Sequence, residues 1–191
     1  MGRKLDKIIV VDVESTCWMG EPPIGQMNEI IEVGVSTIET SNLSIIGKDS
    51  YIIKPRFSKI SDFCTELTGI TQEMVDEGQT FESVCSQIKV NYGSESRIWA
   101  SYGEYDKQQF KKICSMFNAR YPFSDMHWNI KSMASLFYGF PEMGMDKLLN
   151  KLGIKMDGRH HRGIDDAYNI AKILIDILEK GRKNGQENKS T

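Results

Sequence analysis

A chain of 191 residues, 40% of them apolar, can bury one hydrophobic core and is too short for two full domains. Its formal net charge of −2 excludes proteins that hold long nucleic acids by phosphate neutralisation alone. The sequence shows neither the roughly 20 uninterrupted apolar residues of a membrane span nor the apolar region and cleavage site of a signal peptide. We therefore expect a cytoplasmic protein that has no membrane partner.

The first part of the chain predicts three strands. Residues 7–14 form a nearly continuous β-branched run, which is typical of a central strand buried on both faces. Residues 29–39 alternate more clearly between apolar and polar side chains and predict a second strand. A turn-like stretch at 41–49 precedes a third predicted strand at 50–55, which ends at Pro55.

The remaining chain predicts helices interrupted by one more strand. Apolar spacing predicts helices over residues 80–90, 106–119, 130–138, 145–152 and 163–178, and a strand over 97–102. This order predicts an α/β fold with a mixed central sheet flanked by helices. We expect residues 1–180 to form a single domain and the polar residues 181–191 to form a disordered tail.

The four cysteines lie far apart in the sequence. They are Cys17, Cys64, Cys85 and Cys114, and neither a C-x-x-C pair nor a nearby histidine gives them the spacing of a zinc site. We therefore expect free, buried thiols.

Two carboxylates stand at the end of the first predicted strand. Residues two apart on a strand point to the same face, so Asp12 and Glu14 lie side by side. Two adjacent buried charges require a proton or a cation, and hard oxygen ligands favour Mg²⁺ or Mn²⁺ over zinc. The alternative is a strand that ends in solvent, where the same residues are only a polar cap.

Further aspartates precede or begin two predicted helices. Asp106 is either a third ligand, at the end of a strand where α/β sites usually lie, or a helix N-cap. In the last helix, Asp166 falls at about 80° from the centre of the apolar stripe and Asp165 at about 180°. Only Asp166 can readily join Asp12 and Glu14, although the helix dipole also favours either charge there.

A loop bounded by glycines, "GRHHRG", precedes the last helix. Its His161 is a candidate general base, because a histidine is partly neutral at pH 7 and can take a proton from water. The alternative is an exposed loop histidine. We give that ordinary interpretation to His160 and His127.

The motifs "VVDVEST", "SYGEYDKQQF" and "HHRGIDDAYNIAKIL" resemble the three exonuclease motifs of the DEDDh 3′→5′ exonucleases, a branch of the ribonuclease H-like superfamily. In that branch a histidine stands five positions before the last aspartate, as His161 does before Asp166, whereas the other branch has a tyrosine where Arg162 stands. Within the branch, "DVESTC", "EPP", "EIIEVGV", "LTGIT" and "GIDDAYNIA" most resemble the Eri-like exoribonucleases. The resemblance extends from about residue 7 to about residue 178 and implies a three-layer ribonuclease H-like fold.

The resemblance also implies a reaction and a partner. The protein would hydrolyse the 3′ ends of single-stranded RNA to 5′-mononucleotides by a two-metal mechanism, with two Mg²⁺ or Mn²⁺ ions. The resemblance further implies four metal ligands and a general base at His161. It also implies contacts of Glu14, Ser15 and His161 with the terminal nucleotide. The ligands are Asp12, Glu14, Asp106 and Asp166.

Two other functions stay open at this point. One is a DNA-trimming exonuclease of the proofreading type, because carboxylates and a histidine do not specify the sugar. The other is a non-catalytic nucleic-acid-binding module. Trp18 is a candidate for stacking on a base, with core burial as the alternative, and Tyr102 stands where many Eri-like members have tryptophan. The sequence carries no signal for an oligomeric state or a physiological substrate.

Overall fold

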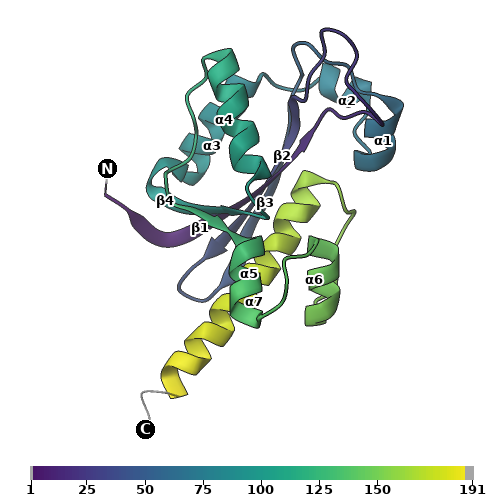
Figure 1. Cartoon of the computed structure of the whole chain (residues 1–191). Helices are drawn as coiled ribbons and strands as arrows, with labels where there is room; N and C mark the ends of the chain where they lie inside the picture. The colour runs from purple at the N-terminus through teal and green to yellow at the C-terminus, as the bar shows by residue number, and fades with distance from the viewer. Residues whose placement is uncertain (1, 188–191) are drawn as a thin grey trace.

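The computed structural model describes residues 2–187 and contains a five-stranded sheet with helices on both faces (Figure 1). The strand order is β3-β2-β1-β4-β5. Neighbours among β1, β2 and β3 pair antiparallel, while β4 runs parallel to both β1 and β5. The strands are β1 (Lys4–Ser15), β2 (Ile30–Glu39), β3 (Ser44–Ile52), β4 (Arg97–Ser101) and β5 (His127–Asn129). This mixed sheet confirms the predicted α/β fold.

Capping residues mark the starts and ends of several helices. Thr80 accepts a hydrogen bond from the Ser83 amide at the start of α3, and Gly139 and Gly153 end α5 and α6 with left-handed backbone conformations. The helices are α1 (Asp62–Thr68), α2 (Gln72–Asp76), α3 (Phe81–Tyr92), α4 (Tyr105–Phe117), α5 (Ile130–Tyr138), α6 (Met145–Leu152) and α7 (Gly163–Glu187), with a 3₁₀ turn at Ser94–Ser96.

Strand β1 lies at the centre of the sheet and is buried on both faces. Ile9 and Val11 belong to the core beneath α3 and α4, whereas Ile8 and Val10 belong to the core beneath α5, α6 and α7. Because side chains alternate along a strand, Asp12 follows Val10 on the α7 face. The end of β1 therefore presents its carboxylates toward the long C-terminal helix, which crosses the sheet (Figure 1).

Several elements differ from the sequence prediction. The third strand starts at Ser44 rather than at residue 50. It is an edge strand ordered by pairing with β2, and its first residues are exposed or partly exposed and have no apolar alternation. The helices α1 and α2 were missed, as was β5, because elements of seven, five and three residues are too short to show a period.

The last helix is longer than predicted. It continues from residue 178 to Glu187, through most of the segment expected to be a tail. Polar residues such as lysine, arginine and glutamine are good helix formers, so a helix anchored by its first turns extends readily. Arg182 also reaches back to the carbonyl oxygens of Thr40 and Ser41. Residues 188–191, the rest of the expected tail, lie outside the described residues.

Two simpler expectations concern thiols and membranes. All four cysteines are free as expected, and three of them are buried, while Cys17 is partly exposed. Among the helices within residues 2–187, none has both the length and the apolar character required to cross a bilayer.

Candidate active site

The carboxylates of β1 lie at the point where its regular pairing ends. Asp12 stands opposite Gly34 of β2, and Glu14 stands opposite Glu32. The register then shifts between Glu14 and Ser15, which is a β-bulge of the kind that redirects side chains beside functional sites. Asp12 is partly exposed and Glu14 is buried, and both side chains line one pocket that a cation could enter.

The first turn of α7 brings a third carboxylate to the same place. Asp12, Glu14 and Asp166 each offer an oxygen, and these oxygens lie within 4.8 Å of one another. Asp166 is 4% exposed. Asp165 turns away, and its Oδ1 lies 2.7 Å from Lys48 Nζ. This placement agrees with the helical-wheel argument, and a set of carboxylate oxygens is what Mg²⁺ and Mn²⁺ prefer.

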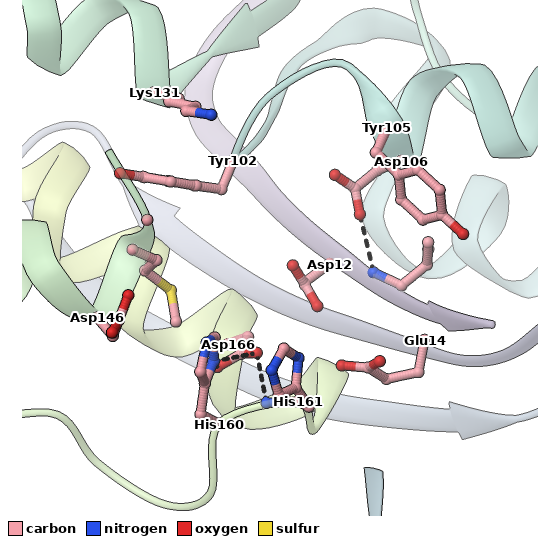
Figure 2. A pocket seen from close by; sticks show the side chains of 13 residues that line it. Asp12, Glu14, Tyr102, Tyr105, Asp106, Lys131, Asp146, His160, His161 and Asp166 are labelled. Carbon is pink, nitrogen blue, oxygen red and sulfur yellow. Dashed lines mark hydrogen bonds and ion pairs between the residues drawn. The ribbon is translucent and has the colours of Figure 1, made fainter. Parts of the chain in front are cut away.

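Asp106 lies in the first turn of α4 and is not its N-cap, a position held by Glu104. The Asp106 Oδ1 instead accepts a hydrogen bond of 2.9 Å from the Val13 amide. Strand β4 pairs with β1 only as far as Val10, so the Val13 amide has no partner on that strand. The Asp106 carboxylate thus accepts a hydrogen bond from the backbone between Asp12 and Glu14, and it lies across Asp12 from Asp166 (Figure 2).

The histidine loop is folded onto Asp166. His161 has a left-handed backbone conformation, with φ of 64°, and its amide donates a hydrogen bond of 2.9 Å to Asp166 Oδ2. The two histidine rings stack with centroids 4.0 Å apart. His160 Nδ1 lies 3.0 Å from Asp166 Oδ2. His160 therefore contacts a candidate ligand, which its ordinary loop interpretation missed; its position beside His161 was the only signal.

Burial and mutual repulsion make this cluster hold protons in the absence of a cation. Burial, then the charges of Asp166 and Glu32, raises the pKa of Glu14 to about 8. Burial, then the charges of Asp106 and Glu14, raises the pKa of Asp12 well above its ordinary value. Burial also raises the pKa of Asp106 to about 6, although the Val13 amide opposes it. Such shifts mark a site built for a positive charge.

The aspartates, Glu14 and both loop histidines line one pocket of about 350 Å³, a size within the range of ligand sites. Figure 2 shows Asp12 between Asp106 and the group formed by Asp166 and His161. Four further side chains that line the pocket are Tyr102, Tyr105, Lys131 and Asp146. Apart from Tyr102, these residues carry no signal in the sequence, because they come from the starts of three different helices that only the fold brings together.

Three other residues considered in the sequence lie at the edge of this site or away from it. Ser15 is buried and its Oγ lies 3.4 Å from Gln109 Nε2. His127 is packed against Trp99, with ring centroids 4.3 Å apart, and its Nε2 lies 2.9 Å from Ser101 Oγ. Trp18 is partly exposed in the loop after β1, so its role in stacking stays a prediction.

Sequence comparison connects this arrangement with a known family. The sequence profile of the exonuclease family, of the RNase T type, matches residues 9–174. The chain belongs to this family. Human 3′-5′ exoribonuclease 1 is 34% identical over 188 residues, a match that covers 92% of this chain and 53% of the human protein. The chain thus spans about half the length of that relative.

Solved structures of the same family superpose closely. The nuclease domain of 3′hExo, a DEDDh family member bound to rAMP, has a TM-score of 0.85 and 32% identity, with 95% of this chain and 96% of that domain covered. A 3′-exonuclease that recognises the 3′ end of the histone mRNA stem-loop has a TM-score of 0.82 and 32% identity, with 93% and 83% covered. The resemblance to DEDDh nucleases is confirmed, and membership of this family implies dependence on divalent metal ions.

Proposed function

We propose that this chain is a divalent-metal-dependent 3′→5′ exoribonuclease that releases 5′-mononucleotides from single-stranded RNA ends. The observation that carries the proposal is the convergence of Asp12, Glu14, Asp106 and Asp166 in one pocket beside His161. The similarity to a human exoribonuclease and to a nuclease domain bound to rAMP supports RNA as the substrate. A cytoplasmic location stays a prediction.

The oxygen atoms of the site fit two Mg²⁺ or Mn²⁺ ions. Asp12 has the central position in the pocket, so it would contact both ions, with Glu14 and Asp166 completing one site and Asp106 contributing to the other. Bound ions of this kind activate an attacking water and stabilise the leaving 3′ oxygen. They would also neutralise the acidic cluster, which lets a protein of net charge −2 accept an RNA end.

In the proposed reaction, His161 would accept the proton of the attacking water. Its ring lines the pocket, and burial together with the charge of His160 lowers its pKa below the ordinary value. The imidazole is therefore mainly neutral at pH 7 and can accept a proton. Glu14 and Ser15 lie at the strand end where the sugar of the terminal nucleotide would dock.

The test is degradation of a 5′-labelled single-stranded RNA and of the matching DNA, with Mn²⁺ or Mg²⁺ and with chelator. We expect metal-dependent shortening from the 3′ end in the wild-type protein and none in Asp12→Ala. Asp166→Asn should also lose activity. The matched control is Asp165→Asn. Asp165 pairs with Lys48 outside the cluster, and its Oδ2 accepts a hydrogen bond from the Arg159 amide that an asparagine side-chain oxygen can still accept, so we expect this variant to retain cleavage.

Each other outcome has a definite meaning. Faster shortening of DNA than of RNA would favour the proofreading-type alternative. No shortening of either strand by folded protein that binds Mn²⁺ would favour a non-catalytic binding module. Equal loss of activity in Asp165→Asn and Asp166→Asn would contradict the assignment of Asp166 as the ligand.

A further inference from the structure

A fifth acidic residue lies beside the cluster and has a different environment. Glu32 of β2 stands opposite Glu14 in the β1–β2 pairing, and its side chain is 0% exposed. A fully buried carboxylate requires compensating donors. Its partners therefore indicate what it does.

Both Glu32 oxygens are occupied by donors from two other segments. Oε2 accepts hydrogen bonds from the Gly163 amide at 2.9 Å and from Arg162 Nε at 3.2 Å. Oε1 accepts from Ser50 Oγ at 2.6 Å and from Arg162 Nη2 at 3.4 Å. We call Glu32, Ser50, Arg162 and Gly163 the Glu32 clasp. With its oxygens used in this way, Glu32 is not a further metal ligand.

Through the clasp, Glu32 holds the two residues that directly follow His161. A left-handed backbone costs a non-glycine residue about 1–2 kcal/mol, so the neighbours of His161 must hold it there. On its C-terminal side, Arg162 and Gly163 are held by Glu32. Its own amide is held by Asp166 Oδ2. The conformation of His161 thus depends on both the clasp and the candidate ligand.

The clasp also fixes where α7 begins. The Arg162 carbonyl accepts hydrogen bonds from the amides of Asp165 at 2.9 Å and Asp166 at 2.8 Å. The Gly163 amide is one of the N–H groups at the helix start that have no partner within the helix, and Glu32 accepts its hydrogen bond. The Glu32 charge there also complements the helix dipole. The position of the first turn of α7 in turn determines where the Asp166 carboxylate lies.

We infer that Glu32 is a positioning residue: through Arg162 and Gly163 it holds His161 and Asp166 in place against Asp12 and Glu14 without touching substrate or metal. The inference rests on the proposed function for its kinetic consequence. Its structural consequence is independent of activity. Loss of the clasp should loosen the histidine loop whatever reaction the site performs.

The central variant is Glu32→Gln, which keeps the shape and removes the charge. We expect amide hydrogen exchange at His161 and Gly163 to become at least about tenfold faster. We expect Mn²⁺ binding, measured by calorimetry, to weaken and kcat on RNA to fall by about 10–100-fold, the usual effect of losing a group that orients a ligand. KM should change by less than about threefold, because the clasp does not contact substrate.

The matched control is Glu29→Gln. Glu29 is also a buried acid, 1% exposed, but it accepts hydrogen bonds from the amides of Arg56, Phe57 and Ser58. We expect this variant to accelerate exchange only at residues 56–58, whose amides Glu29 holds, and to retain kcat within about twofold, assayed well below its melting temperature.

A second variant separates position from stability. Glu32→Gln combined with Arg162→Met removes both charges, so no unpaired charge stays buried and stability should recover. A positioning role predicts that kcat remains low in this double variant. Recovery of kcat together with stability would show that the clasp only stabilises the fold and would overturn the inference.

Amide hydrogen exchange tests the structural part of the inference about Glu32 even if the wild-type protein degrades neither RNA nor DNA. Unchanged exchange at His161 in Glu32→Gln would overturn the inference regardless of activity. Faster exchange at His161 with unchanged Mn²⁺ binding and unchanged kcat would also overturn it. Faster exchange with weaker Mn²⁺ binding would support it even if the exoribonuclease proposal failed.

Discussion

At the scale of single residues, His161 differs from the other two histidines in its backbone conformation and in its hydrogen-bond partners. Its left-handed conformation turns the loop so that its amide contacts Asp166 while its ring lines the pocket. Asparagine tolerates this conformation better than most residues. The substitution His161→Asn therefore removes the imidazole while adding little backbone strain.

We expect His161→Asn to lower turnover by roughly 10²–10⁴-fold, the usual contribution of a general base. Because the carboxylates stay in place, Mn²⁺ affinity should be nearly unchanged. Single-turnover cleavage of 5′-labelled RNA and calorimetric titration with Mn²⁺ would measure the two effects. Full turnover in this variant would remove His161 from the mechanism.

At the scale of elements, the close approach of α7 to β2 depends on a glycine. A Cβ atom at Gly34 would lie 1.9 Å from the Gly163 carbonyl carbon, and backbone atoms cannot move aside as a flexible side chain could. The helix start therefore sits directly on the strand that pairs with β1. This contact brings Asp166 within reach of Asp12.

We expect Gly34→Ala to destabilise the fold by about 3 kcal/mol, the upper end of the roughly 1–3 kcal/mol that overpacking typically costs, because the contact is with backbone. The control is Gly47→Ala on the neighbouring strand β3, where a Cβ would find its nearest atom at an ordinary 3.7 Å. That change should alter stability by less than about 1 kcal/mol. Urea denaturation of both variants measures the difference, and equal stability would refute the close contact.

At the scale of the whole molecule, the acidic cluster couples stability to pH and to metal. The pKa of Glu14 is raised from an ordinary 4.5 to about 8, and the pKa of Asp12 is raised as well. Between these values the folded protein holds protons that the unfolded chain has released. The acidic cluster therefore contributes a stability that falls as pH rises through this interval in the metal-free protein. His127, whose pKa burial lowers to about 4, contributes the opposite slope and offsets part of this fall.

We expect the melting temperature of the chelator-treated protein to fall between pH 5 and pH 8. A loss of about 2 kcal/mol would lower it by about 4–8 °C in a chain of this size. Saturating Mn²⁺ should restore stability more at pH 8 than at pH 5, since a cation binds the deprotonated cluster. Asp12→Ala should show a smaller pH dependence. A melting temperature that rises over this interval without metal would contradict the predicted linkage.

Sequence patterns alone were enough to predict the elements with a strong period and to select the residues proposed to carry the chemistry. The helices at Ile130–Tyr138 and Met145–Leu152 were predicted with their observed bounds, because apolar spacing is a local property. The same logic assigned Asp12 and Glu14 to one strand face and selected Asp166 over Asp165. Each of these inferences needs only the geometry of a single element.

Features that depend on contacts between residues distant in the sequence became visible only in the folded protein. Strand β3 is ordered by pairing with β2, so its own side chains did not mark its start. Asp106 was separated from its N-cap alternative by the Val13 amide, which lies 93 positions away. The Glu32 clasp joins residues more than 100 positions apart. In the sequence alone, a buried glutamate cannot be distinguished from any other polar residue of a strand. Local periodicity specifies faces, whereas packing alone specifies which faces meet.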